Sequence, residues 1–185
     1  MTDGIQNDLS RPLLGKVVQV CMVTSDHERM LTNFVRLGIG PWQILTLGQP
    51  RITEALYYGV PHSFQLTRCL ALVNGFVWEV IQPIGGTSIF HDFLASRGEG
   101  VHHLGMTYQT DDLASCVREL EQRGFRVAMT GLWDDRLRYA FLATDTAIGP
   151  FIELWEKPAD FVEPIPERWF PEGAEPAKAL HFHSL

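Results

Sequence analysis

The sequence lacks any run of about 18 consecutive apolar residues, the length that a helix needs to cross a membrane. Its polar first stretch, residues 1–11, also lacks the apolar segment of a signal peptide. Basic residues are not in excess, since 15 Lys and Arg stand against 22 Asp and Glu, a formal net charge of −7. Nucleic acids and anionic membranes attract clustered Lys and Arg. We therefore expect a soluble, cytoplasmic protein that binds a small organic molecule rather than nucleic acid or a membrane.

Cysteine is scarce as well. The three cysteines, Cys21, Cys69 and Cys116, are odd in number, widely spaced and without a Cys-x-x-Cys pair. Each stands in an apolar stretch with strand or helix character. The favoured interpretation is a buried, reduced thiol at each position rather than a disulfide or a nucleophile.

The 185 residues, 45% of them apolar, suit one domain of ordinary size or two small modules that share a core. We predict an N-terminal arm over residues 1–15, a folded domain over 16–157 and a proline-rich tail over 158–185. The prolines preclude a long helix in the tail. We expect the tail to wrap over the domain or over a partner subunit, anchored by Trp169 and Phe170.

One order of elements occurs twice within the domain, and this repeat is the main organising signal of the sequence. The first copy is predicted as a strand over 17–24, a helix begun by Ser25-Asp26 and ended by Gly38, a strand over 42–47, a loop over 48–62, and strands over 63–73 and 76–82 joined by Asn74-Gly75. The second copy follows a helix begun by Thr87 or Ser88, and is predicted as a strand over 101–109, a helix from Asp111-Asp112 to Arg123, and strands over 125–130, 137–143 and 151–156.

The sequence therefore predicts an α+β fold of two β-α-β-β-β modules, the first over 16–83 and the second over 101–157, with a linker helix in 84–100. One face of each module's sheet is apolar, so the two must pack together or pair edge to edge to bury it. We expect each module to curl around a cavity, with its first and fourth strands as neighbours at the centre.

The two copies can be superposed by residue type, and the superposition aligns polar residues in apolar strands. Gln19 of the first strand falls on His103, and Glu79 falls on Glu153. We expect these four residues, at equivalent positions of the two modules, to point into the cavity. Successive strand residues point to opposite faces, so His102 and His103 cannot both face the cavity. We assign His103 to the site and place His102 in solvent or behind His103.

An amide oxygen, two carboxylates and one imidazole form a ligand set suited to a divalent ion such as Zn, Co, Ni, Mn or Fe(II). Four protein ligands leave one or two positions open, as in a catalytic site. An ion that polarises a carbonyl group lowers the cost of forming the neighbouring enolate. Glu153 or Glu79 could then remove and return the adjacent proton. This chemistry favours an isomerase or epimerase over ring-cleaving Fe(II) oxygenases, which use two His and one carboxylate.

Five further residues are candidates for the substrate pocket. Arg68 and Gln65 precede Glu79 and could hold an anionic group, although a hairpin edge can equally be solvated. His62 could be an acid/base partner. Tyr139 and Trp42 could line the pocket, or pack in the core or against another subunit.

The doubled pattern resembles the vicinal oxygen chelate superfamily, which includes glyoxalase I, methylmalonyl-CoA epimerase, extradiol dioxygenases and bleomycin-resistance proteins. The resemblance covers about residues 16–157. Its most specific parts are Glu79-Val80-Ile81-Gln82-Pro83, the helix over 89–97 and Gly98-Glu99-Gly100-Val101-His102-His103-Leu104-Gly105, which are similar to methylmalonyl-CoA epimerases, and Gly149-Pro150-Phe151-Ile152-Glu153-Leu154, which resembles the family's last strand.

The resemblance implies a glyoxalase-like fold, with metal positions on Gln19, Glu79, His103 and Glu153, and the expected assembly is a homodimer. The epimerases usually have His where this chain has Gln19, and Gln, Glu, His and Glu together are similar to the set in animal glyoxalase I. The leading hypothesis is a metal-dependent isomerase or epimerase acting next to a carbonyl, such as that of an acyl thioester. The alternatives are a glyoxalase I-like lyase acting on a hemithioacetal and a metal-free binding protein of the same fold.

Overall fold

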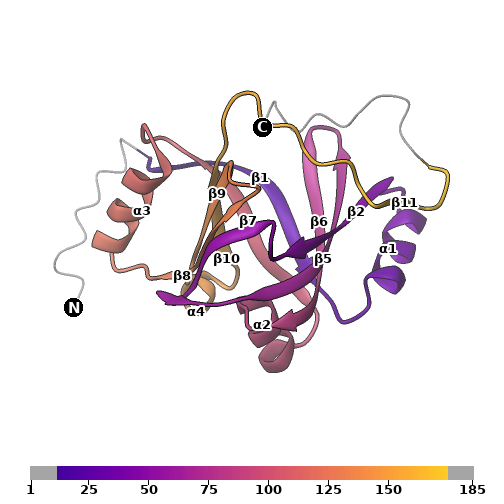
Figure 1. Ribbon diagram of the computed structural model, residues 1–185, viewed down its shortest axis with the longest axis horizontal. Helices are drawn as coiled ribbons and strands as arrows, with labels where there is room; N and C mark the ends of the chain where they lie inside the picture. The colour runs from indigo at the N-terminus through magenta and orange to yellow at the C-terminus, as the bar shows by residue number, and fades with distance from the viewer. Residues whose placement is uncertain (1–11, 175–185) are drawn as a thin grey trace.

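The computed structural model describes residues 12–174. Residues 1–11, which make up most of the predicted arm, and 175–185, the end of the predicted tail, lie outside the described residues. The described chain forms one curled sheet of 11 strands with helices on its outer side (Figure 1). This is the α+β architecture with a curled sheet that the sequence predicts. No helix within residues 12–174 is long and apolar enough to span a membrane.

The elements follow in the order β1 (Leu14–Val23), α1 (His27–Arg36), β2 (Trp42–Gly48), β3 (Ile52–Tyr57), β4 (Val60–Pro61), β5 (Phe64–Val73), β6 (Phe76–Gly86), α2 (Ile89–Arg97), β7 (Gly100–Tyr108), α3 (Leu113–Gln122), β8 (Val127–Trp133), β9 (Leu137–Leu142), α4 (Asp145–Ile148), β10 (Phe151–Glu156) and β11 (Arg168–Phe170). The sheet order is β11-β2-β5-β6-β1-β7-β10-β9-β8-β3-β4.

Local sequence signals set the ends of the main helices. The side chains of Asp26, Ser88 and Asp112 each accept a hydrogen bond from the backbone N–H three residues later, and so cap α1, α2 and α3. In the β5–β6 turn, Asn74 and Gly75 both have positive φ, 53° and 77°, as a two-residue hairpin of this sequence requires. The predicted caps and hairpin are therefore confirmed.

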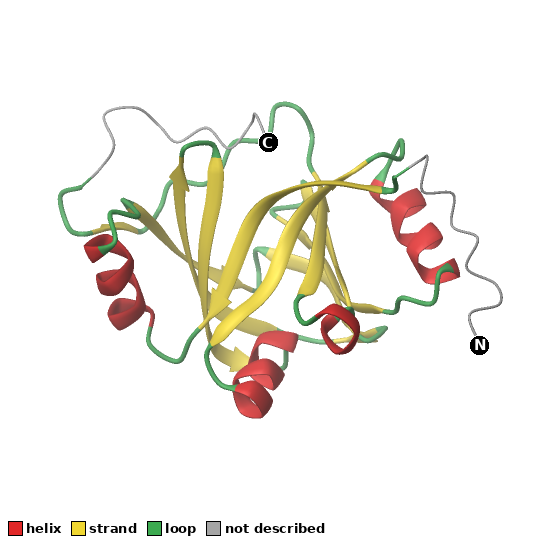
Figure 2. Cartoon of the chain, turned by 180° about the vertical axis from the view of Figure 1, so that it is seen from behind, coloured by secondary structure: helices red, strands yellow, loops and turns green. Residues whose placement is uncertain are grey.

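The centre of the sheet has the predicted arrangement, in which the first and last strands of each copy are neighbours. β1 runs parallel to β6, and β7 runs parallel to β10. β1 and β7 then pair antiparallel, so they join the two halves. Cys21 of β1 lies opposite Glu79 on one side and His103 on the other. Figure 2 shows the helices outside the long central strands.

The predicted loop over 48–62 is wrong, because this segment contains β3 and β4. β3 leaves its own half of the molecule and pairs antiparallel with β8 of the other half. The pairing partner lies far along the chain, so the Tyr, Pro and Gly content of the segment gave no sign of it. In return, β11 of the tail pairs antiparallel with β2 of the first half. Each half therefore covers an outer edge of the other, which protects strand edges from unwanted pairing.

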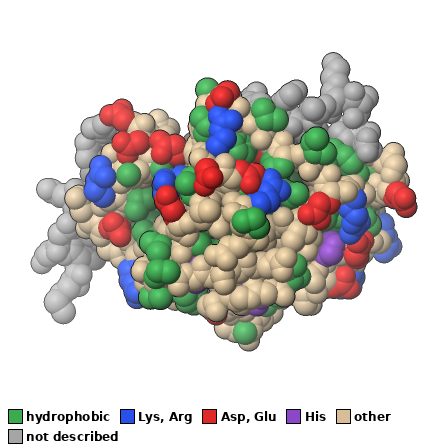
Figure 3. Space-filling view, viewed as in Figure 1, with side chains coloured by type: hydrophobic (Ala, Val, Ile, Leu, Met, Phe, Trp, Pro, Cys, Tyr) green, Lys and Arg blue, Asp and Glu red, His purple; other side chains and the backbone are tan. Residues whose placement is uncertain are grey.

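Apolar residues form separate clusters on the two faces of the sheet. One cluster lies under α1 and includes Leu31, Trp42 and Cys69, with Phe170 of β11 packed against it. A second lies under α3, and the largest fills the inner side of the sheet. The three cysteines are buried and free, as predicted. On the face seen in Figure 3, acidic and basic side chains are interspersed, so neither sign forms a continuous patch there.

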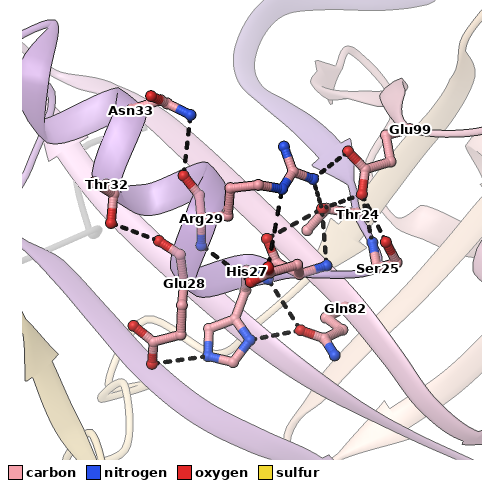
Figure 4. Close-up of polar contacts among 10 residues, drawn as sticks. Thr24, Ser25, His27, Glu28, Arg29, Thr32, Asn33, Gln82 and Glu99 are labelled. Carbon is pink, nitrogen blue, oxygen red and sulfur yellow. Dashed lines mark hydrogen bonds and ion pairs between the residues drawn. The ribbon is translucent and has the colours of Figure 1, made fainter.

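Glu99, directly before β7, connects the linker to the start of α1 through its side chain (Figure 4). Its Oε1 accepts hydrogen bonds from Thr24 Oγ1 at 2.8 Å and from the Ser25 N–H and Oγ at 3.0 and 2.8 Å. Its Oε2 forms an ion pair with Arg29. The Arg29 guanidinium and these donors lower the pKa of Glu99 to about 2.

We expect Glu99→Gln to lower the free energy of unfolding by about 1 kcal/mol at pH 7, since the ion pair is partly exposed and screened. A carboxyl with a lowered pKa stabilises the fold above its unfolded pKa of about 4.3, and this contribution is lost as pH falls towards 2. The difference between wild type and variant should therefore shrink between about pH 5 and pH 2 in urea unfolding. Glu119→Gln, which removes a surface pair with Arg123 on α3, is the control, and an equal effect there would contradict the assignment.

Candidate metal centre

Four polar side chains converge where the central strands meet. Gln19 comes from β1, Glu79 from β6, His103 from β7 and Glu153 from β10. His103 Nε2 lies 3.1 Å from Glu79 Oε2 and 3.2 Å from Glu153 Oε2. Gln19 Nε2 lies 3.1 Å from Glu79 Oε2 and from His103 Nε2, and 3.0 Å from Glu153 Oε2. The structure thus brings together the four residues that the repeat aligned.

The cluster is withdrawn from solvent. His103 is 0% exposed, Glu79 4% and Gln19 5%. Burial opposes a charge on His103, but the carboxylates of Glu153 and Glu79 outweigh it and raise the pKa of the imidazole. Burial would likewise raise the pKa of Glu79, but the bond from His103 and the charge of Arg68 lower it. Without an ion, a protonated His103 therefore balances charge between two carboxylates.

The spacing of these atoms fits a divalent ion. Ligand atoms at 2.0–2.2 Å from a shared ion lie about 3.0–3.5 Å from each other, and the Glu79 and Glu153 oxygens here each lie 3.0–3.2 Å from Gln19 Nε2 and His103 Nε2. Gln19 turns its NH₂ toward the carboxylates, and a half-turn of the amide brings its oxygen to the same place. Binding would require His103 to lose its proton, which couples affinity to pH.

His102 stands behind His103. The interpretation of His102 as a solvent-facing residue is wrong, because its side chain is 0% exposed and stacks on Phe151. Its Nδ1 lies 3.0 Å from His103 Nδ1, and its Nε2 lies 3.4 Å from the Ile89 carbonyl oxygen. That oxygen can only accept, so the Nε2 of a neutral His102 carries the proton and its Nδ1 accepts from His103. This series of hydrogen bonds, from His103 to His102 to the Ile89 carbonyl, leaves Nε2 of a neutral His103 free to bind a metal.

Cys21 was not predicted to belong to this neighbourhood. Its Sγ lies within 4.8 Å of ligand atoms of Glu79 and His103. Burial and the charge of Glu79 raise the pKa of the thiol, and Sγ donates to the Met22 carbonyl at 3.4 Å. The thiol therefore forms a wall of the site. Its position two residues after Gln19, on the same strand face, was the signal in the sequence that could have placed it here.

A cavity of about 830 Å³, counted to its open mouth, adjoins the cluster. Gln19, Glu79 and Glu153 form part of its wall. Most of the remaining lining is apolar and includes Leu47, Ile52, Phe64, Leu66, Met129 and Phe141. The cavity is therefore suited to a small organic molecule with an apolar body.

The five predicted pocket residues divide into two groups. Arg68 and Tyr139 line the cavity. Trp42 is fully buried under α1, with its ring 5.2 Å from that of Phe34. His62, stacked on Phe64, and Gln65 are not among the lining residues of the described chain.

Arg68 links the candidate metal centre to the tail. Its Nε donates to Glu79 Oε1 at 2.8 Å, and its Nη1 donates to Glu163 Oε2 at 3.3 Å. The guanidinium also lies 4.9 Å from the ring centre of Trp133. The sequence gave no signal for Glu163 in the cavity, because the tail has neither helix nor strand periodicity from which a facing side chain could be read.

A family model described as the glyoxalase/bleomycin resistance protein/dioxygenase superfamily matches residues 18–141. The chain belongs to this superfamily. Its members are mostly metal-dependent enzymes, including epimerases, lyases and dioxygenases. The matched segment contains Gln19, Glu79 and His103, whereas Glu153 lies beyond its end.

Solved structures of the superfamily share the fold. Methylmalonyl-CoA epimerase from Mycobacterium tuberculosis is 20% identical over 80% of this chain and 89% of its own, with a TM-score of 0.53. A selenomethionine methylmalonyl-CoA epimerase is 19% identical over 80% and 98%, also with a TM-score of 0.53. A hypothetical protein from Bacillus halodurans is 16% identical over 80% and 98%, with a TM-score of 0.52. At these identities the similarity establishes the fold alone. No protein with a curated description matches the chain.

Proposed function

We propose that this protein is a metal-dependent isomerase or epimerase that moves a proton next to the carbonyl group of a small organic substrate. The observation that carries the proposal is the convergence of two carboxylates, Glu79 and Glu153, each 3.0–3.2 Å from Gln19 Nε2 and His103 Nε2, at the wall of a largely apolar cavity. Membership of a superfamily of mostly metal-dependent enzymes supports it.

The four side chains would hold one divalent ion, of the class Zn, Co, Ni, Mn or Fe(II). When bound, the ion would supply Lewis-acid stabilisation of the negative charge that develops on a carbonyl oxygen. Gln19 contributes a neutral ligand and His103 a neutral imidazole, so Glu79 and Glu153 together match the charge of a divalent ion, and Arg68 offsets part of the charge of Glu79. The apolar cavity wall excludes water, which strengthens this electrostatic effect.

Glu153 is the better candidate for the base. Arg68 holds Oε1 of Glu79 while Oε2 faces the cluster, so both oxygens of Glu79 are committed. The side chain of Glu153 is 16% exposed, against 5% for Glu79, and it lines the cavity. In the proposed step a Glu153 oxygen takes the proton from the carbon, and the electron pair of the broken C–H bond is delocalised onto the carbonyl oxygen. Return of the proton to this or an adjacent carbon completes the reaction.

We expect Glu153→Gln to lower deuterium incorporation from D₂O about 1000-fold, because the amide cannot accept the proton. The first substrates to assay are methylmalonyl-CoA, taken from the relatives, and a panel of simple ketones and thioesters, read by mass spectrometry. Glu156→Gln on the exposed end of β10 is the matched control and should exchange as wild type does. Unchanged deuterium exchange in Glu153→Gln would contradict the role of Glu153 as the base. If ion-loaded wild type exchanged deuterium into none of the substrates of the panel, the proposed isomerase activity would be contradicted.

A second candidate is a glyoxalase I-like lyase, favoured by the amide ligand Gln19 in the set Gln, Glu, His and Glu. It predicts turnover of methylglyoxal with glutathione by the ion-loaded protein, and inactivity there removes it. Metal analysis tests both enzymes at once. Less than about a tenth of an equivalent of ion after reconstitution would indicate a metal-free binding protein instead.

A further inference from the structure

The tail passes over the cavity before it reaches β11. In Figure 1 the yellow segment runs from the second half of the molecule across to β11, beside α1. We call residues 157–170 the strap. Phe161 of the strap is buried, with its ring 5.7 Å from that of Trp133 in the cavity wall. Further along, Glu167 accepts hydrogen bonds from the N–H and Oγ1 of Thr46 on β2, both at 3.0 Å.

Between these two anchors, the strap places a carboxylate inside the cavity. Glu163 lines it, with a side chain that is 14% exposed, and pairs with Arg68, which is 15% exposed. Arg68 is fixed from two other sides, by Glu79 at 2.8 Å and by the ring of Trp133. The guanidinium therefore forms a positioned carboxylate receptor next to the metal ligands, and the chain's own carboxylate fills it.

The charges along the cavity make Glu163 replaceable by another carboxylate. Arg68 and Lys157 are the cations of the lining, and Glu79, Glu153 and Glu163 are its anions. If Glu163 left without replacement, the cavity would lose a negative charge beside Arg68 in a site of low polarity, which is unfavourable. A singly charged acid that takes the place of Glu163 keeps the balance.

The rest of the lining suits the body of such an acid. It is mainly apolar, as described above. Two side chains in this lining, Tyr139 and Trp133, have a buried hydroxyl oxygen and a buried indole nitrogen with no hydrogen-bond partner among the described residues. Buried donors are normally satisfied, so these two unpaired polar atoms beside the cavity are unusual.

We propose that Arg68 binds a carboxylate group of the substrate, that Glu163 of the strap occupies this receptor in the empty protein, and that the substrate is a small organic monocarboxylate with an apolar body that displaces Glu163. This inference rests on the proposed function, in that it takes the same cavity as the substrate site. The strap then acts as a competitor that is released by the right ligand and keeps other small molecules out.

The test is calorimetric titration of phenylacetate and hexanoate, with the uncharged phenylacetamide as the matched ligand, into metal-free and ion-loaded protein. We expect phenylacetate to bind at least tenfold tighter than phenylacetamide. Glu163→Gln removes the competing charge and should tighten phenylacetate about tenfold without changing phenylacetamide. Asp160→Asn is the control, because it removes a charge from the strap on an exposed residue paired with Arg136, and it should behave as wild type. Phenylacetate should also raise backbone hydrogen exchange in residues 161–165 of wild type.

Equal affinity for acid and amide, no gain from Glu163→Gln, or no binding of either acid to that variant would overturn the inference. Arg68→Lys keeps a charge beside Glu79 but loses the planar fork, and should narrow the preference for the acid over the amide. The metal-free titrations do not depend on the ion, so they separate the two proposals. Arg68-dependent binding without ion uptake or deuterium exchange would support the receptor and contradict the isomerase, and the reverse result would do the opposite.

Discussion

Replacing His103 by alanine is expected to lower the affinity for a divalent ion by more than about 100-fold, because the variant loses the imidazole at the centre of the ligand set. His103 Nε2 is within 3.2 Å of the Gln19 amide and both carboxylates. None of these three side chains can replace the imidazole as a ligand without moving from its own position. Isothermal titration with Co or Zn measures the affinity. In wild type, ion at 100 times its dissociation constant should raise the free energy of unfolding by about 2.7 kcal/mol.

The same substitution should weaken the metal-free protein. Glu79 and Glu153 would both lose the protonated imidazole that lies between them, Glu79 would keep only Arg68 as an ionic partner, and breaking a buried ion pair costs about 3 kcal/mol. Urea unfolding in the presence of a chelator gives this number. His62→Ala is the control, because His62 is outside the cluster and its two ring nitrogens have no hydrogen-bond partner among the described residues. Ion affinity should stay the same there, and an unchanged affinity in His103→Ala would mean that the ion binds elsewhere.

Arg68→Met is expected to lower the free energy of unfolding by about 3–5 kcal/mol, the largest effect we foresee on stability without ion. Methionine keeps much of the apolar contact with Trp133 but donates no hydrogen bond. Glu79 Oε1 would lose the bond of 2.8 Å, and Glu163 would lose its pairing with Arg68 in a largely buried site. Glu79 Oε2 keeps its contacts with His103 and Gln19, so the loss falls on Glu79 Oε1 and on Glu163, whose desolvation is then less well offset.

Arg51→Met is a close match for this experiment. Arg51 also lies over Trp133, at 5.7 Å from the ring centre, and also pairs with a carboxylate, Asp134. Its side chain is 31% exposed, so its loss should cost about 1 kcal/mol or less. Equal losses in the two variants would show that contact with Trp133, rather than the buried pairing with Glu79, accounts for the effect of Arg68. The double variant Arg68→Met with Glu79→Gln should recover part of the stability, since the neutral amide is less costly to bury.

Local signals were sufficient for most of the fold. The capping residues Asp26, Ser88 and Asp112 begin their helices where the sequence indicates, and Asn74-Gly75 forms the hairpin. Because side chains in strands alternate between two faces, superposing the two copies was enough to select Gln19 rather than its neighbours. The structure brings that residue to the other three.

Long-range pairing was the part that local sequence could not indicate. β3 is defined by its partner β8, and nothing in the composition of residues 48–62 distinguishes an edge strand from a loop. Glu163 enters the cavity because Phe161 and Glu167 fix the strap on either side of it, and a fixed irregular segment has no period from which its facing side can be read. Trp42 packs in the core, one of the uses that the sequence left open, because an aromatic in a strand is equally suited to core and pocket.

The exchange of edge strands between the halves affects how the chain is made in the cell. Thr46 and Glu167, whose hydrogen bonds accompany the β2–β11 pairing, are 121 positions apart in the sequence. At ordinary rates of translation that distance takes on the order of ten seconds to synthesise. During this time β2 and β3 have unpaired hydrogen-bonding edges, which neighbouring nascent chains and chaperones can contact. The first half of the protein therefore cannot complete its strand pairing until the second half and the strap have left the ribosomal exit tunnel.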